Sequence, residues 1–334
     1  MTGKTRFAVV GYGRMGKKHV SVIDDHPDCE LAAIVDTHAQ QGLPGIPFYN
    51  DLDRFLESSA VAETDVVVIA TPNGLHAPHA LKCLNAKKHV LIEKPMALNS
   101  TDAAAIIKKA TEVQRQVFVM MQNRFSPVSV WLKELADSGV LGNIYLVQVN
   151  CFWNRDERYY KKGSWHGTKD LDGGALFTQF SHFVDLLYWC FGDITNISSN
   201  FRNFGHEGMI DFEDTGIAHF DFVKGGVGCL SYTTATWDKN LESSFTVIAE
   251  NGSLKIGGQY MDKVDYCHVK DYSAPNPDTL VTHSNQTAFT ETSVNHRNFI
   301  YEMLYSLKSE NPIQTLANDG QKVLGMIERM YSVI

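Results

Sequence analysis

Lys94 lies in a sequence context where a lysine can assist a proton transfer. It follows the apolar run at residues 90–92 and the acidic residue Glu93, and Pro95 then directs the chain out of the expected strand. In an open parallel sheet, ligands bind just beyond the carboxyl ends of the strands, so a lysine there would face a cleft and bond a substrate hydroxyl. The alternative is a surface lysine paired with Glu93, and these residues alone favour that alternative.

Residues 11–16 form a glycine-rich turn of the kind that holds a dinucleotide. They have the pattern Gly-x-Gly-x-x-Gly, after an expected strand at residues 7–10 and before an expected helix. Gly11 permits the tight turn, Gly13 lets the backbone approach a pyrophosphate, and Gly16 lets the helix pack closely on the strand. We therefore assign cofactor contacts to the whole turn, namely Gly11, Tyr12, Gly13, Arg14, Met15 and Gly16.

Asp36 ends the next expected strand, twenty residues after Gly16. A carboxylate at this place accepts hydrogen bonds from the adenosine ribose hydroxyls and repels a 2′-phosphate. The spacing therefore favours a cofactor contact over a simple turn residue, and it predicts NAD rather than NADP. The nearby cations Lys17 and Lys18, together with His38, could weaken that preference.

Two further loops should lie at the same edge of the sheet. The strand expected at residues 64–70 ends in one loop, and the strand expected at residues 117–121 ends at Gln122. Both places lie beside the ribose and nicotinamide of a bound dinucleotide. His76 in the first loop is more typical of a capping or packing residue, although it could also be a ligand. We assign the following residues at this edge to the cofactor: Thr71, Pro72, Asn73, His76, Glu93, Lys94, Pro95 and Gln122.

A polar stripe lies on an otherwise apolar helix expected at residues 173–189. Thr178, His182 and Asp185 are spaced i, i+4 and i+7, which predicts that they share one face. Because so apolar a helix must be buried, its polar stripe should line a cavity or join a satisfied network. His182 has the chemistry of a general base near neutral pH, and the alternative is a buried structural histidine.

Residues 153–167 are too polar for a core and too aromatic for a linker. Aromatic faces pack on sugar rings or nucleobases, and arginine forks bind phosphate. The alternative is an ordered surface loop whose cations pair with Asp156 and Glu157. We favour ligand contact, and assign it to Arg155, Arg158, Tyr159, Trp165 and His166.

Two kinds of sheet are expected to position these residues. The alternating strands and helices of residues 1–122 predict an α/β domain with a doubly wound parallel sheet, a Rossmann-type NAD-binding domain. Residues 123–334 predict an α+β domain with a large, mainly antiparallel sheet, because segments of period-two alternation follow one another across short turns. One face of that sheet should carry helices and the other could face a partner subunit, so we expect a homodimer or homotetramer. The expected strands of this sheet lie at residues 143–152, 195–204, 215–223, 226–236, 243–250 and 253–256.

Composition narrows the class of protein. With 334 residues, 44% of them hydrophobic, the chain can form two domains with ordinary cores. The net charge of -8 and the lack of a basic block argue against nucleic acid as a partner. The six cysteines include no Cys-x-x-Cys pair, so they suggest neither a disulfide framework nor a metal site. Neither a signal-peptide pattern nor an apolar stretch of about 20 residues is evident, so we expect no membrane and a cytoplasmic protein.

Four motifs together resemble the family of glucose-fructose oxidoreductase, inositol dehydrogenase and rhizopine-catabolism proteins, the Gfo/Idh/MocA family. In order along the chain, they are GYGRMG with Asp36, ATPNGLH, EKP and QNRF. The resemblance covers nearly the whole chain. It implies that Lys94 is catalytic and that the peptide around Pro95 lies under the nicotinamide.

The resemblance also implies a Gly-Gly-x-x-x-Asp-x-x-x-His-x-x-Asp pattern, of which the first aspartate and the histidine act with the lysine. Here His182 and Asp185 match, but Thr178 replaces the first aspartate. Threonine can bond a substrate hydroxyl but accepts a proton poorly, so the role of base should shift to His182 or Lys94. Family members also place residues such as Asn295, His296 and Arg297 near the substrate. We assign catalysis to Lys94, His182 and Thr178, and substrate contacts to Lys94, Arg124, Arg155, Arg158, Tyr159, Trp165, His166, Thr178, Gln179 and His182.

These features predict an NAD-dependent dehydrogenase that oxidises a ring hydroxyl of a sugar. The resemblance and the loop at residues 153–167 favour a nucleotide-activated hexosamine, a UDP-N-acetylhexosamine or its uronic acid oxidised at the 3-hydroxyl, in the synthesis of surface-polysaccharide precursors. One alternative is an inositol, polyol or free aldose dehydrogenase. Another is a non-catalytic NAD-binding regulator, since a fold alone does not establish chemistry.

Overall fold

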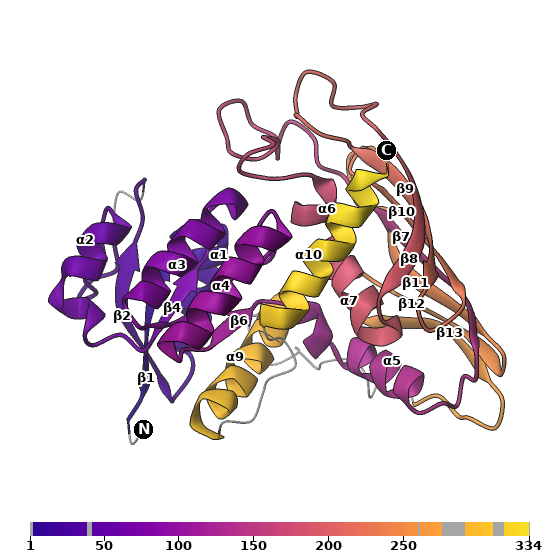
Figure 1. The fold of residues 1–334 in the computed structure, drawn as a ribbon, viewed down its shortest axis with the longest axis horizontal. Helices are drawn as coiled ribbons and strands as arrows, with labels where there is room; N and C mark the ends of the chain where they lie inside the picture. Colours follow the sequence, from indigo (N-terminus) through magenta and orange to yellow (C-terminus); the bar gives the residue numbers. More distant parts are fainter. Residues whose placement is uncertain (1–2, 39–41, 260, 276–290, 310–316, 334) are drawn as a thin grey trace. The chain divides into compact units, whose positions relative to one another are not determined.

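The computed structural model describes residues 3–38, 42–259, 261–275, 291–309 and 317–333 (Figure 1). The contacts divide the chain into two compact units. Unit 1 comprises Met1–Met120 and His296–Leu324, and unit 2 comprises Met121–Asn295 and Gly325–Ile334. The sequence predicted a single boundary after residue 122. The contacts also assign residues 296–324 to unit 1, so the chain returns to its first unit near the C-terminus.

Unit 1 is built on a six-stranded parallel sheet in the order β3-β2-β1-β4-β5-β6. Its strands are β1 Thr5–Val10, β2 Cys29–Val35, β3 Phe48–Tyr49, β4 Val66–Ile69, β5 His89–Ile92 and β6 Val117–Val119. The central strand β4 is apolar and fully buried at every residue, as expected of a strand with both faces covered. This sheet confirms the predicted doubly wound fold. Its strand order reverses between β1 and β4, which is where such sheets bind dinucleotides.

The helices of unit 1 begin where the sequence provides caps. The Asp51 side chain accepts a hydrogen bond from the Asp53 backbone N–H at 2.7 Å, and the Asn99 side chain accepts one from Asp102 at 2.8 Å. The helices are α1 Arg14–Asp24, α2 Leu52–Glu57, α3 His76–Asn85 and α4 Ser100–Val113, joined by much of α9 Glu291–Ser309 and the first half of α10 Ala317–Ser332.

Unit 2 contains a mainly antiparallel sheet, as predicted, and its seven strands have the order β13-β12-β11-β7-β10-β9-β8, of which β13 was not expected from the sequence. Its strands are β7 Ile144–Phe152, β8 Ile194–Arg202, β9 Thr215–Phe222, β10 Val227–Thr233, β11 Glu242–Ala249, β12 Gly252–Gly257 and β13 Lys263–Val269. One pair departs from the prediction, because β7 and β10 run parallel. The long segment between them contains two helices and two strands, so β10 does not return as a hairpin. Helices α5 Pro127–Asp137, α6 Ala175–Thr178 and α7 Ser181–Phe191 lie on one face of this sheet (Figure 1).

The helix expected at residues 173–189 is interrupted, which corrects the sequence prediction. It ends as α6 at Thr178 and begins again as α7 at Ser181. Phe180 lies at the break, fully buried, and its ring packs against Trp153 at 5.4 Å and Tyr232 at 4.9 Å between ring centroids. Burial of this ring competes with a continuous helix. Thr178 and His182 therefore lie on two helices rather than on one continuous face.

Among the described helices, none combines the length and the apolar character that a membrane crossing requires.

Candidate functional site

The predicted cofactor residues of unit 1 follow four adjacent strand ends. The sheet register pairs Val10 with Val35 and with Ile69, and it pairs Ile69 with Ile92. The glycine-rich turn, Asp36, the loop at residues 71–76 and the Glu-Lys-Pro turn follow these four residues. The structure therefore brings this part of the predicted site together at one edge of the sheet, where ligands of such folds bind.

The glycine-rich turn fits a pyrophosphate. A Cβ atom on Gly16 would lie 1.8 Å from the Gly11 carbonyl oxygen, so Gly16 is required by packing within the protein. A Cβ atom on Gly13 would meet nothing within 4 Å, so no protein contact explains that glycine. Helix α1 begins there without a side-chain cap and without an acidic residue in its first turn. Uncapped N–H groups and an open glycine are what an anionic dinucleotide needs.

Asp36 is fixed beside this turn by two backbone N–H groups. The Tyr12 N–H donates to Oδ2 at 2.6 Å and the His38 N–H donates to Oδ1 at 2.7 Å. A carboxylate oxygen has more than one acceptor position, so each oxygen can still accept a ribose hydroxyl. Lys17 lies 5.6 Å from the centroid of the Tyr12 ring, within reach of a cation–π contact. These residues fit the NAD adenosine ribose.

His76 joins two of the loops at this edge. Its ring is 1% exposed, with Nδ1 2.7 Å from the Pro95 carbonyl oxygen and Nε2 2.9 Å from the Thr71 carbonyl oxygen. Burial lowers the pKa of His76, although the two carbonyl contacts and Glu93 oppose that effect. This contact pattern is that of a packing residue, which was the first of the two interpretations that the sequence allowed.

Glu93 is buried, which excludes the surface ion pair that the sequence first favoured for Lys94. Its side chain is 7% exposed, and Oε1 lies 2.6 Å from His19 Nε2 and 3.9 Å from His296 Nε2. Burial alone would raise the pKa of Glu93, but the His19 hydrogen bond and the charges of His19, His296 and Lys94 lower it to about 2. Lys94 itself is half-buried.

Sequence reasoning missed His19. The signal was available, because His19 lies three residues after Gly16 and four before Ile23, on the buried face of α1. A histidine on an otherwise apolar helix face needs a polar partner inside the protein. The identity of that partner depends on the sheet, so periodicity could locate His19 but not pair it with Glu93.

In unit 2, His182 contacts Gln122. The Gln122 amide nitrogen lies 3.1 Å from His182 Nε2, and the two residues are 7% and 8% exposed. An amide nitrogen only donates, so Nε2 of His182 is the acceptor in this contact. The Nε2 lone pair of His182 is therefore engaged by the Gln122 amide.

Arg124, which the sequence assigned to substrate, lies in a buried ion pair with Asp185. Its Nη2 donates to Oδ1 at 2.6 Å and its Nε donates to Oδ2 at 3.0 Å. The two side chains are 1% and 0% exposed. Such a carboxylate can remain charged in the interior only with a close cationic partner, and the two-pronged guanidinium supplies one.

Thr178 bonds a carboxylate that the sequence analysis did not consider. Its hydroxyl donates to the backbone oxygen of Asp172 at 2.8 Å and also to the Asp172 carboxylate. The Gly167 N–H donates to the same carboxylate at 2.6 Å, and Asp172 is 1% exposed. Asp172 therefore connects Gly167, at the end of the loop at residues 153–167, to Thr178 of α6.

Five of the residues predicted to bind substrate form a group that we call the aromatic cluster: Arg155, Tyr159, Trp165, His166 and Gln179. Arg155 Nε donates to Gln179 Oε1 at 2.7 Å, and Gln179 Nε2 donates to the Tyr159 hydroxyl at 2.8 Å. The His166 ring lies 4.3 Å from the Tyr159 ring and 3.9 Å from the Trp165 ring, between centroids. The cluster combines π faces with a cation, which suits a sugar or nucleobase joined to an anion.

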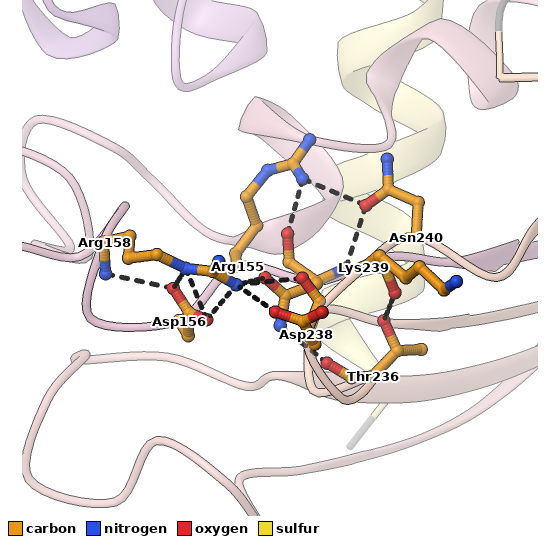
Figure 2. A network of polar contacts seen from close by, with 8 residues as sticks. Arg155, Asp156, Arg158, Thr236, Asp238, Lys239 and Asn240 are labelled. Atoms are coloured by element: carbon orange, nitrogen blue, oxygen red, sulfur yellow. Dashed lines mark hydrogen bonds and ion pairs between the residues drawn. The ribbon is translucent and has the colours of Figure 1, made fainter.

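Arg158 is not part of this cluster and lies in a surface network that Arg155 also joins (Figure 2). It bonds Asp156 at 2.6 Å and lies 3.4 Å from Asp238, with 61% of its side chain exposed. The Arg158 hydrogen bonds hold the pKa of Asp156 at about 2. For Arg158, the structure thus agrees with the alternative stated from the sequence, a surface loop whose cations pair with nearby carboxylates. The network ties the loop to the β10–β11 connection, where Arg155 Nη1 also reaches Asn240.

Comparison with known families matches both parts of the chain. Residues 5–121 match the model described as "Oxidoreductase family, NAD-binding Rossmann fold", and residues 130–255 match the Gfo/Idh/MocA C-terminal domain.

Within the described residues, no group of three or more His, Cys, Asp and Glu side chains could hold a metal ion.

Among solved structures, the WlbA dehydrogenase of Bordetella pertussis, crystallised with NADH and UDP-GlcNAcA, is similar over nearly the whole length. The identity is 30% and the TM-score 0.86, covering 99% of this chain and 96% of that one. An uncharacterised oxidoreductase of Synechocystis is 30% identical over 58% of this chain and 53% of its own length. Inositol 2-dehydrogenase of Mycolicibacterium gilvum is 35% identical over 41% of each chain. The match thus spans about half the length of these curated relatives.

The buried Glu93 predicts a specific pH dependence of stability. Its folded pKa is about 2, below the ordinary value of 4.5, so its contribution is complete above about pH 4.5 and is lost as the pH falls through about 2. We expect the loss to be roughly 3 kcal/mol. Urea unfolding between pH 5 and pH 2.5 should show a shallower pH dependence for Glu93→Gln than for the wild type. Glu57→Gln, at an exposed carboxylate, is the control, and equal slopes for all three proteins would contradict the prediction.

Proposed function

We propose that this chain, which belongs to the Gfo/Idh/MocA oxidoreductase family, is an NAD-dependent dehydrogenase that oxidises a ring hydroxyl of a sugar or polyol. NAD supplies the acceptor for the hydride that leaves the hydroxyl-bearing carbon. The chain's own residues bind and orient the reactants and take up the hydroxyl proton. The open Gly13 and the fixed Asp36 carboxylate in unit 1 support the choice of cofactor.

Three residues are proposed to act on the substrate. Lys94 bonds the hydroxyl and takes part in the transfer of its proton, with His182 as the second candidate base, whose Nε2 would exchange its contact with Gln122 for one with the substrate hydroxyl. Thr178 contributes a bond to a substrate hydroxyl and not proton transfer. Its own hydroxyl proton is held by Asp172, while its oxygen retains acceptor capacity.

We propose a nucleotide-activated hexosamine as substrate, a UDP-N-acetylhexosamine or its uronic acid oxidised at the 3-hydroxyl, in the synthesis of surface-polysaccharide precursors. The aromatic cluster is the observation that carries this choice, because Arg155 provides a charge for a diphosphate beside three aromatic rings. The similarity to a WlbA dehydrogenase crystallised with UDP-GlcNAcA supports it. The similarity to an inositol 2-dehydrogenase favours the second candidate, an inositol or polyol dehydrogenase.

Calorimetry separates these substrates. In the presence of NADH, we expect UDP-GlcNAcA or UDP-N-acetylglucosamine to bind and free inositol not to bind. Arg155→Met should weaken that binding by roughly tenfold or more, because it removes a charge-assisted contact to phosphate. Arg158→Met is the matched control, since Arg158 belongs to the surface network, and it should leave the affinity nearly unchanged. Turnover of inositol without any UDP-sugar binding would reverse the choice.

The role of Lys94 has its own test. Lys94→Ala should lower turnover roughly a hundredfold or more, since it removes a group that bonds and deprotonates the substrate. Its affinity for NAD, measured by fluorescence titration, should stay within about twofold. Lys82→Ala, at an exposed lysine paired with Asp53, is the control. Unchanged turnover of Lys94→Ala would contradict this mechanism. A wild-type protein that binds NAD but turns over no substrate would instead support the alternative of a non-catalytic regulator.

We also propose that the chain forms a homodimer or homotetramer through the sheet of unit 2. Ile217 on β9 and Val227 on β10 are 44% and 49% exposed on neighbouring strands, where a second sheet can stack. Light scattering should therefore give the mass of more than one chain. Ile217→Lys should lower that mass, while Lys263→Ala, on the edge strand β13, should not. A wild-type monomer would contradict the proposal.

A further inference from the structure

Three side chains from separate elements of unit 1 meet at the Glu-Lys-Pro turn. Glu93 follows β5, His19 lies on α1 and His296 lies on α9. His19 Nε2 is 2.6 Å from Glu93 Oε1, His296 Nε2 is 3.9 Å from the same oxygen, and the two imidazole rings lie 5.7 Å apart between centroids. All three residues are at most 5% exposed. Nothing in the hydride transfer itself requires these two histidines.

The carboxylate of Glu93 cannot be buried without partners, because removing a charge from water costs several kcal/mol. The groups that face it are His19 and Lys18 from α1, His76 from α3, His296 from α9, and Lys94 from its own turn. Burial lowers the pKa of Lys18 to about 8 even though Glu93 acts to raise it. His19 thus bonds one oxygen of a carboxylate that is next to Lys94 in the chain, and His296 lies within ion-pair distance of the same oxygen.

We propose that His19 and His296 are positioning residues: through the Glu93 carboxylate they set the orientation of Lys94 and the pH range over which its amino group exchanges a proton. This inference rests on the proposed role of Lys94. It assigns to α9, a helix near the C-terminus, a function in a turn that lies about two hundred residues earlier.

The turn is held on both sides of Lys94. On one side His19 holds Glu93, and on the other side His76 Nδ1 contacts the Pro95 carbonyl oxygen at 2.7 Å. The residues before and after Lys94 are therefore both fixed by buried contacts. The charge of Lys94 acts to lower the pKa of Glu93, so the two groups interact, and in return the negative charge of Glu93 favours the protonated form of Lys94.

Amine labelling tests this without substrate or cofactor. Competitive acetylation followed by mass spectrometry gives the pH midpoint at which each lysine loses its proton. Glu93→Gln should move the Lys94 midpoint to lower pH by about one unit or more, because the ammonium loses a stabilising negative charge. His19→Ala should move it to higher pH, because Lys94 and Lys18 then become the main partners of the carboxylate. His19→Gln restores a donor and should return the midpoint towards the wild-type value.

The chain offers a matched control in His26. Like His19, it lies on the α1 side of the contact with α9, and its ring packs on Tyr301 at 4.2 Å between centroids, but it does not contact Glu93. His26→Gln should lower stability without moving the Lys94 midpoint. Lys82 in every variant is the internal standard. If His19→Ala does not fold, as judged by circular dichroism, His296→Ala provides the same test from the other helix.

The outcomes distinguish this inference from the proposed function. If the Lys94 midpoint does not move from its wild-type value in Glu93→Gln and in the histidine variant that folds, the positioning role is wrong. If the midpoints move as expected and the pH profile of turnover moves with them, the role is supported. If the midpoints move but Lys94→Ala keeps full turnover, the inference about proton exchange holds and the proposed catalytic role of Lys94 fails.

Discussion

The burial of the Glu93 carboxylate is the interaction on which the candidate site of unit 1 depends. A charge in the interior requires partners, and here they come from α1 and α9, helices near opposite ends of the chain. The same carboxylate thereby fixes the turn that carries Lys94 and connects the C-terminal segment to the first unit. The Glu93 side chain thus contributes both to the packing of unit 1 and to the position of the turn that carries Lys94.

In unit 2, too, buried carboxylates have close hydrogen-bonding or cationic partners. Asp185 of α7 is paired with Arg124, and Asp172 accepts hydrogen bonds from Gly167 and Thr178. Glu213, whose pKa is raised by burial, accepts bonds from the Tyr232 and Tyr331 hydroxyls, at 2.7 Å and 2.6 Å. A Cβ atom on Gly174 would lie 2.5 Å from the Tyr331 hydroxyl, so the second glycine before α6 is required there. Asp185 and Asp172 thus hold candidate site residues directly, Arg124 and Thr178.

Local patterns predicted what local physics determines. The glycine-rich turn, the position of Asp36 and the two helix caps follow from backbone conformation and short-range hydrogen bonds, and the sheet classes follow from periodicity. The break at Phe180, the parallel β7–β10 pair and the His19–Glu93 contact depend on residues far apart in sequence. Periodicity contains no information about which distant partner a buried polar group or aromatic ring will meet.

Understanding the role of Thr178, which replaces an aspartate, requires both the sequence and the structure. The sequence indicated that a threonine cannot serve as the base, and the structure adds that its hydroxyl proton is directed to Asp172. His182, by contrast, accepts a hydrogen bond at Nε2 from the neutral Gln122 amide. The replacement of the aspartate thus leaves position 178 with a side chain that can orient a hydroxyl but cannot usefully exchange a proton with it.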